Sequence, residues 1–374
     1  MDSTGPLSTD GLVSMLTHEG VPVEHETFSR YVQNLDAEEL RQMWRAMTVV
    51  RAWDLEATSL QRQGELGLWV QSLGQEGAQI GSGRALRDND FVFPSYREHG
   101  VAHLQGVDLV EVLRIFRGLQ HGAWTPAEHN FHLYTLVIGA HSLHATGYAM
   151  AKAREQKANP EQEPGAVVAY FGDGATSQGD VNESLIFASV YNAPIVFFCQ
   201  NNQYAISESV TRQTKVPLAD RGRGVGMPTI RVDGNDVIAC RAVTEWALDH
   251  ARSGKGPVFI EALTYRMGAH TTSDDPTRYR DKEEEQYWAD RDPIARLDTY
   301  LSARGELSDE FREDVAQEAK ALGERARSTV KSWKRPPLLD MFKDVYALPH
   351  AAVDAERVWF ERFQESFDTE EAGR

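Results

Sequence analysis

Residues 166–174 read AVVAYFGDG, and residues 194–202 read PIVFFCQNN. Each stretch begins as a continuous apolar run, which is typical of a strand buried on both faces of a parallel sheet. The intervening residues 180–191 predict a helix, so the two strands form a strand–helix–strand unit. Because the carboxyl ends of parallel strands meet at one edge of the sheet, Asp173 and Asn202 are expected side by side.

The residues at this predicted edge have the chemistry of a metal and phosphate site. A carboxylate and an amide oxygen are the hard ligands that Mg²⁺ prefers. Glycines on both sides of Asp173 let the backbone approach a phosphate, and the helix near Asp180 offers its amino end to an anion. A Gly-Asp-Gly turn alone is common. The interval of 26 residues between Gly174 and Asn201 is what makes the pattern informative.

Strands and helices alternate around this unit, which predicts an α/β fold with a parallel sheet covered by helices on both faces. Residues 1–35 are expected to form an extended or loosely attached arm. Residues 36–346 form the α/β domain with its C-terminal helices, and residues 347–374 form a tail. Further strands are predicted at 229–232 and 257–263, helices at 37–63, 74–86, 107–119, 236–252 and within 281–332, and a polar surface loop at 154–165.

Composition excludes several classes of protein. A formal charge of −17 argues against a nucleic-acid-binding surface. No apolar run approaches the roughly 20 residues of a membrane helix, and the runs at 133–140 and 195–199 have the length of buried strands or short core segments. The first basic residue, Arg30, follows five acidic ones, so no targeting peptide is visible. With only Cys199 and Cys240, we expect a reducing compartment, the cytoplasm.

Two other functional classes fit parts of the chain less well. A nicotinamide-dependent oxidoreductase would suit a doubly wound sheet, but residues 222–226 (GRGVG) miss the third glycine of the dinucleotide motif and follow no strand. A non-catalytic scaffold would suit the acidic helical C-terminus, but it would not need Asp173, Asn202 and His270 together. The histidine pairs His129/His132 and His141/His144 allow a transition-metal site, although packing roles are the simpler interpretation.

Several motifs together resemble one enzyme family. The Gly-Asp-Gly turn followed by 26 residues and Asn-Asn resembles the thiamine diphosphate motif. Residues 93–100 (FPSYREHG) and 264–275 (TYRMGAHTTSDD) resemble two ordered elements of the α subunits of 2-oxo acid dehydrogenases. The likeness spans residues 40–346. Within the family, residues 231–237 (RVDGNDV) and the 201–207 stretch resemble the branched-chain type more than the pyruvate type.

The resemblance implies a role for each matching residue. It implies that Asp173 and Asn202 bind Mg²⁺ by their side chains and Tyr204 by its carbonyl oxygen. It implies that the diphosphate is contacted by the side chains of Tyr96, Arg97 and His270. It also implies contacts from the backbone of Gly174 and Ala175. It also implies that the backbone of Leu136 and Ile138 meets the aminopyrimidine ring, with Ile138 as the wedge that bends the cofactor. His270 is the residue to which it assigns a catalytic role.

The resemblance also implies partners. No glutamate here matches the one that protonates the aminopyrimidine, which in this family comes from a β subunit in an α₂β₂ heterotetramer. The implied reaction is oxidative decarboxylation of branched-chain 2-oxo acids, with acyl transfer to the lipoyl group of an acyltransferase component. A pyruvate or acetoin dehydrogenase α subunit is the alternative. Gln200 stands where branched-chain relatives have an arginine to the phosphates.

Overall fold

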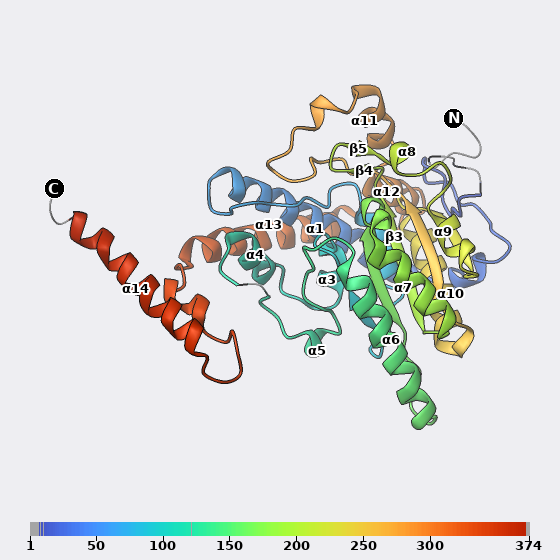
Figure 1. Cartoon of the computed structure of the whole chain (residues 1–374). Coiled ribbons are helices and arrows are strands. Elements are labelled where there is room, and N and C mark those ends of the chain that lie inside the picture. The colour runs from blue at the N-terminus through green and yellow to red at the C-terminus, as the bar shows by residue number, and fades with distance from the viewer. Residues whose placement is uncertain (1–6, 8, 10, 121, 372–374) are drawn as a thin grey trace. The chain divides into compact units, whose positions relative to one another are not determined.

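The computed structural model describes residues 7, 9, 11–120 and 122–371 of the chain. These residues form two compact units, Met1–Lys331 and Ser332–Arg374. The first unit is built around a sheet, with β3 surrounded by α6, α7 and α10 in Figure 1. The predicted α/β class with a parallel, helix-covered sheet is therefore confirmed.

All strands of the central sheet run parallel, in the order β1-β2-β3-β7-β6. Every residue of β3 and β7 is buried, which explains why these sequences are continuous apolar runs and not alternating ones. The strands are β1 (Phe91–Phe93), β2 (Val167–Gly172), β3 (Ile195–Asn201), β6 (Thr229–Asp233) and β7 (Val258–Leu263). A two-stranded antiparallel sheet joins β4 (Tyr204–Ala205) to β5 (Glu208–Ser209).

Helices cover both faces of this sheet. On one face, α6 (Ala140–Ala158) and α7 (Gly179–Val190) share a buried core with alternate residues of β2 and β3, including Phe171. On the other face, α2 (Glu76–Gly83) and α10 (Val237–His250) pack together, and the Tyr170 hydroxyl donates to Ser82 of α2 at 2.9 Å. Successive side chains along a strand thus pack alternately against the helical layers on the two faces.

The chain contains further helices besides those that cover the sheet. Helix α1 is capped by the Asp36 carboxylate, which accepts a hydrogen bond from the Glu39 amide at 2.8 Å. No helix of the described residues has the length and apolar character needed to cross a membrane. The other helices are α1 (Ala37–Arg62), α3 (His99–Leu104), α4 (Leu109–Arg117), α5 (Pro126–His129), α8 (Val210–Gln213), α9 (Ala219–Gly224), α11 (Lys282–Ala289), α12 (Pro293–Ala303), α13 (Asp309–Ser332) and, in the second unit, α14 (Ala351–Glu371).

Two local predictions were wrong. The polar loop predicted at 154–165 begins later, because α6 continues to Ala158 through Ala, Lys, Arg, Glu and Gln, all good helix formers. The apolar run 133–140 is not a buried segment. Leu136, Val137 and Ile138 are 49%, 71% and 41% exposed, and they lie outside any strand.

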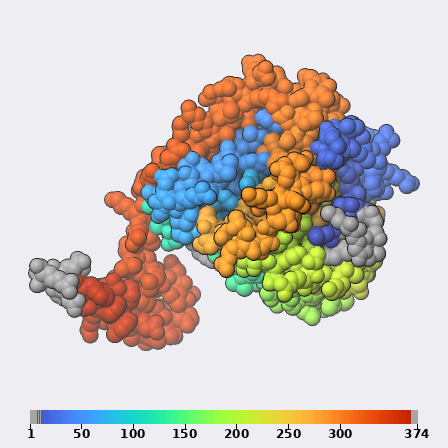
Figure 2. Space-filling model, turned by 90° about the horizontal axis from the view of Figure 1, so that it is seen from above, coloured from blue at the N-terminus to red at the C-terminus, as the bar shows by residue number. Residues whose placement is uncertain are grey.

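Residues 11–23 of the N-terminal segment are attached to the first unit by backbone contacts. Val13 pairs with Val232 at the free edge of β6, donating to Arg231 O at 2.8 Å. Asp236 then accepts from the backbone amides of Met15 and Leu16, both at 2.7 Å. Figure 2 shows the dark-blue N-terminal segment beside the orange part of the chain that contains α12. A buried carboxylate and a free strand edge hold this segment, and neither is visible in its own sequence.

The boundary between the two units also differs from the predicted one. The division lies at Lys331–Ser332, whereas the sequence placed the domain boundary at 346–347. In the second unit the Phe342 and Phe360 rings pack 5.7 Å apart, so residues 332–346 belong with α14. This contact between rings on either side of residues 343–359 explains the difference.

We expect Asp236→Ala to destabilise the first unit much more than Asp36→Ala. Both carboxylates cap helices, but Asp236 is buried and also serves Met15, Leu16 and the Arg296 guanidinium. The free energy of unfolding should fall by about 3–5 kcal/mol in Asp236→Ala. It should fall by about 1 kcal/mol in Asp36→Ala. Urea unfolding measures both, and hydrogen exchange of residues 11–23 should lose protection in Asp236→Ala alone. Equal losses in the two variants would contradict the attachment of the arm.

Candidate active site

A cavity of about 270 Å³ lies at the carboxyl edge of the central sheet. Its walls come from the segments that follow β1, β2, β3 and β7, and from the loop before α6. This is where an open parallel sheet binds its ligands. The lining residues are Gln75, Ser95, Tyr96, Arg97, Glu98, Ile138, Gly139, His141, Gly172, Asp173, Gly174, Ala175, Gln178, Gln200, Asn202, Tyr204, Ala205, Ile206, Arg266 and His270.

Asp173 and Asn202 meet in this cavity, as their positions after β2 and β3 predict. Asp173 is 1% exposed and Asn202 is 6% exposed. The oxygen of the Asn202 amide lies 3.2 Å from Asp173 Oδ1 and 3.1 Å from the Tyr204 carbonyl oxygen. With the amide in this orientation three oxygens face one another, and the Tyr204 carbonyl also accepts a hydrogen bond from Arg266 at 3.0 Å. Turning the amide over would instead let its nitrogen donate to both oxygens.

This arrangement passes a test of fit for a hard divalent cation. Carboxylate, amide and carbonyl oxygens are the donor set that Mg²⁺ takes from proteins. Burial raises the pKa of Asp173 to about 6. A cation beside this carboxylate would stabilise its charged form and so lower the pKa of Asp173 again.

Two buried arginines stand beside these oxygens. Arg97 donates to the backbone carbonyls of Gln71 and His270, and Arg266 donates to those of Tyr204 and Ile206 at 3.0 and 2.8 Å. Neither guanidinium forms an ion pair with a carboxylate of the described residues. Burial and the nearby Arg97 lower the pKa of Arg266 to about 10. Two guanidinium groups without a direct carboxylate partner favour an anionic ligand.

His270 lies between the two arginines, and its protonation follows from them. Its Nδ1 is 3.1 Å from Arg266 Nη1 and 3.4 Å from Arg97 Nη2, so it must accept hydrogen bonds and carries no proton. Burial and the two guanidinium groups lower the pKa of His270 to about 3. The neutral ring therefore has its proton on Nε2, where it can donate a hydrogen bond to a ligand.

A buried polar network supports the loop that carries Tyr96 and Arg97. The Gln200 amide donates to Glu98 at 2.7 Å and accepts from Gln79 at 3.1 Å, and Gln79 also donates to the Arg97 carbonyl at 2.9 Å. Gln200 thus lines the cavity while its amide is held by Gln79 and Glu98. Burial raises the pKa of Glu98, whose carboxylate also accepts from the Ser95 hydroxyl.

The structure brings nearly all predicted site residues together. Leu136 is the exception, because it does not line the cavity. The sequence missed Glu98, Arg266 and Gln75 as cavity residues. Arg266 could have been predicted from the sequence, since it lies inside the 264–275 motif. Gln75 carried no signal, yet it is 1% exposed and its Nε2 has no hydrogen-bond partner among the described residues. An unpaired buried donor in the cavity wall fits an anionic ligand.

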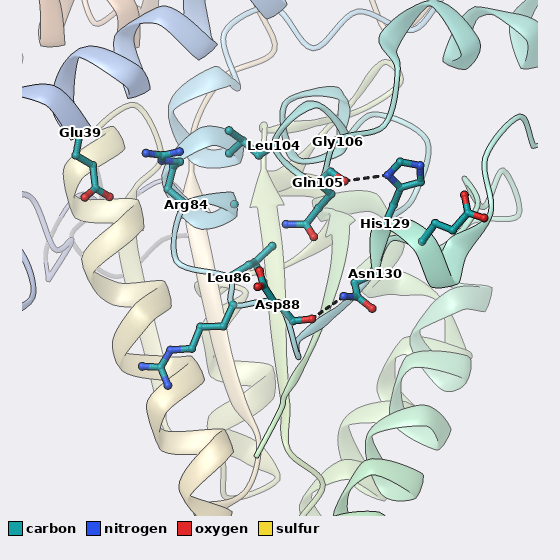
Figure 3. A pocket seen from close by; sticks show the side chains of 12 residues that line it. Glu39, Arg84, Leu86, Asp88, Leu104, Gln105, Gly106, His129 and Asn130 are labelled. Carbon is teal, nitrogen blue, oxygen red and sulfur yellow. Dashed lines mark hydrogen bonds between the residues drawn. The ribbon is translucent and has the colours of Figure 1, made fainter. Parts of the chain in front are cut away.

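A second cavity, of about 610 Å³, is lined by residues that precede β1 and by the ends of α2, α3 and α5. Figure 3 shows His129 donating to the Gln105 carbonyl and Asn130 donating to that of Asp88. Charges of both signs line it, and no predicted site residue does. No group of three or more His, Cys, Asp or Glu side chains in the described ranges could hold a metal, so the paired histidines form no such site there. Cys199 and Cys240 are buried and free.

Fold and site together define an α/β protein with a polar cavity, lined by arginine, carboxylate and amide side chains, at the carboxyl edge of a parallel sheet. The chain belongs to the dehydrogenase E1 component family, which matches residues 44–338. Members of this family are enzymes that depend on thiamine diphosphate. The resemblance predicted from the motifs is confirmed.

Individual relatives place the chain more finely. It is 44% identical to the 3-methyl-2-oxobutanoate dehydrogenase subunit alpha of Mycobacterium tuberculosis, over 92% of each chain. It is 38% identical to the pyruvate dehydrogenase E1 component subunit alpha of Acholeplasma laidlawii, over 84% of this chain and 90% of the relative. The same subunit of Bacillus subtilis is 36% identical, over 85% of each chain.

The neutral state of His270 leads to a pH-dependent test. Since the lowered pKa keeps the ring unprotonated above about pH 5, its titration should contribute nothing to the activity profile between pH 5.5 and 8.5. We expect His270→Ala to reduce turnover by roughly 10- to 150-fold through the lost Nε2 donor. His270→Gln, whose amide nitrogen can occupy the place of Nε2, should recover part of the loss and keep the wild-type profile.

Two assays separate the roles of His270. A dye that accepts electrons reports decarboxylation alone, and a lipoyl domain reports acyl transfer as well. Loss of the acidic limb of the profile in His270→Gln would show that the ring titrates after all. Wild-type rates for His270→Ala in both assays would leave the ring only a structural role.

Proposed function

We propose that the chain is the α subunit of a 2-oxo acid dehydrogenase that oxidatively decarboxylates branched-chain substrates such as 3-methyl-2-oxobutanoate. The relative that shares 44% identity over 92% of each chain carries that activity in its name, whereas the pyruvate-specific relatives share 36–38%. The observation that carries the proposal in the structure is the meeting of Asp173, Asn202 and Tyr204 oxygens beside two unpaired arginines.

Mg²⁺ is proposed to bind between Asp173 Oδ1, Asn202 Oδ1 and the Tyr204 carbonyl. The close approach of these three oxygens supports the assignment. The metal would bridge to the diphosphate of thiamine diphosphate. The side chains proposed for the diphosphate are Tyr96, Arg97 and His270, with the backbone of Gly174 and Ala175.

Thiamine diphosphate, when bound, would supply the nucleophile and the electron sink that decarboxylation of a 2-oxo acid needs. This chain's own residues are proposed to bind and orient. Arg97 and Arg266 neutralise the diphosphate, and His270 donates from Nε2. Ile138, which lines the cavity, is the proposed wedge against the cofactor, and the Leu136 backbone is the proposed partner of the aminopyrimidine.

The catalytic carboxylate is proposed to come from a β subunit. Among the described lining residues the carboxylates are Asp173, assigned to the metal, and Glu98, occupied by Ser95 and Gln200. Neither is free to protonate an aminopyrimidine. Three consecutive exposed apolar side chains, 136–138, lie at the loop beside the cavity and fit burial by a partner.

The proposed assembly is an α₂β₂ heterotetramer that passes its acyl group to the lipoyl domain of an acyltransferase component. The proposed location is the cytoplasm, which two free buried thiols support.

Asp173→Ala and Asn202→Ala should each abolish detectable Mg²⁺-dependent binding of thiamine diphosphate while the fold is retained. Each change removes one oxygen from a site where buried charges depend on one another. Calorimetry of the assembled complex measures binding, and Thr211→Val, on a nearby exposed surface, serves as the control. Binding within about twofold of wild type in either variant would contradict the proposed metal site.

The proposed function is tested by expressing the chain alone and with a β subunit. The lone chain should show no turnover of 2-oxo acids, and the complex should reduce a dye in their presence. We expect kcat/KM for 3-methyl-2-oxobutanoate to exceed that for pyruvate by roughly 10- to 200-fold, since extra apolar contacts are worth about 1–3 kcal/mol. A clear pyruvate preference would favour the alternative substrate, and comparable turnover by the lone chain would overturn the two-subunit assembly.

A further inference from the structure

Residues 203–213 form a compact hairpin directly after β3. Strand β4 pairs with β5, the tip residue Ile206 has φ 57°, and the short helix α8 follows. The hairpin closes on itself through the Val210 amide, which donates to the Gln203 carbonyl at 2.8 Å. It therefore carries Tyr204 at its start and Gln213 at its end.

The hairpin lies directly against the turn that carries Asp173. A Cβ added to Gly174 would be 2.8 Å from the Ala205 Cβ, closer than side chains normally approach. Glycine at 174 is thus required by the close seating of the hairpin. This seating brings α8 over Asp173, although Gln213 is 40 positions away in sequence.

Gln213 forms a hydrogen bond with only one of the two oxygens of the Asp173 carboxylate. Its Nε2 donates to Asp173 Oδ2 at 2.8 Å. The other oxygen, Oδ1, is the one that lies 3.2 Å from the Asn202 amide. One oxygen is therefore held from outside the cavity, and the other points to the place where Asn202 and Tyr204 converge.

A purely structural role explains this contact poorly. Helix α8 is already anchored without this contact, because Val210 is fully buried. Gln213 is only half-buried, and its other contact, with the Glu208 carbonyl, is long at 3.4 Å. Its short hydrogen bond goes to Asp173, as expected of a residue that orients a metal ligand.

We propose that Gln213 is a positioning residue for the metal site, which holds the Asp173 carboxylate so that Oδ1 faces the cation. Through one hairpin, residues 203–213 supply both the Tyr204 carbonyl and the group that orients Asp173. This inference rests on the proposed function, since it takes the cation to be Mg²⁺ bound with thiamine diphosphate.

The test compares Gln213→Leu with wild type in the complex with the β subunit. Leucine keeps most of the side-chain volume and removes the donor. Thr211→Val, which also alters a polar side chain on α8 but does not contact Asp173, is the matched control. Calorimetry follows thiamine diphosphate binding while Mg²⁺ is varied, and the electron paramagnetic resonance of Mn²⁺ follows the metal itself.

We expect Gln213→Leu to need roughly 10- to 100-fold more Mg²⁺ for half-maximal binding, and Thr211→Val to stay within about twofold of wild type. Saturating Mg²⁺ should restore the affinity of Gln213→Leu for thiamine diphosphate. The melting temperature without ligands should be equal in all three proteins, because the change acts on the metal and not on the fold.

Two results would overturn the proposal. One is an unchanged Mg²⁺ requirement in Gln213→Leu. The other is a weakened affinity that Mg²⁺ does not restore, accompanied by a lower melting temperature, which would assign the contact to the fold. A wild-type complex without Mg²⁺-dependent binding would contradict the proposed function itself, and so the two failures are distinguishable.

Discussion

The parallel pairing of β2 with β3 is the constraint on which the site depends. Gly172 and Gln200 are the last partners in this register, so Asp173 and Asn202 both follow within two residues of the same edge of the sheet. Neighbouring strands lie about 4.8 Å apart. Side chains at the ends of two such strands are therefore close enough to contact the same cation. A slip of one residue would turn each side chain to the opposite face and separate the two ligands. The flanking strands β1 and β7 then bring Arg97 and Arg266 to the same edge.

Charge is distributed unevenly between the core and this edge. The buried Arg252 and Arg296 each form an ion pair with a carboxylate, Asp90 and Asp233 respectively. Arg97 and Arg266 instead donate to carbonyl oxygens and lie beside His270, without an ion pair among the described residues. Burial raises the pKa of Asp173, while burial and neighbouring cations lower that of Arg266. The proposed cation, bound with an anion, would act on both effects at once.

The sequence predicts the part of this site that local pattern encodes. Apolar runs locate β2 and β3, and their spacing places Asp173 beside Asn202. The sequence cannot predict contacts between side chains that are remote in sequence when the residues belong to no recognisable motif. Gln213 reaches Asp173 only because a hairpin folds back, and Gln75 reaches the cavity from α2's amino end. The attachment of the N-terminal arm was missed for the same reason, since Asp236 lies more than two hundred positions beyond Met15.

One error of prediction has a physical cause that concerns the assembly. An apolar run is normally buried, and this expectation held for 195–199 but not for 136–138. The rule rests on the free energy of removing apolar surface from water, about 25 cal/mol per Å². It applies to the assembled state in which a chain functions, whichever chain provides the cover. The exposed run borders a cavity whose lining carboxylates already have partners or a proposed metal. A β subunit that seats on residues 136–138 would bury the apolar run and bring the missing carboxylate with it, so one contact would supply both stability and catalysis.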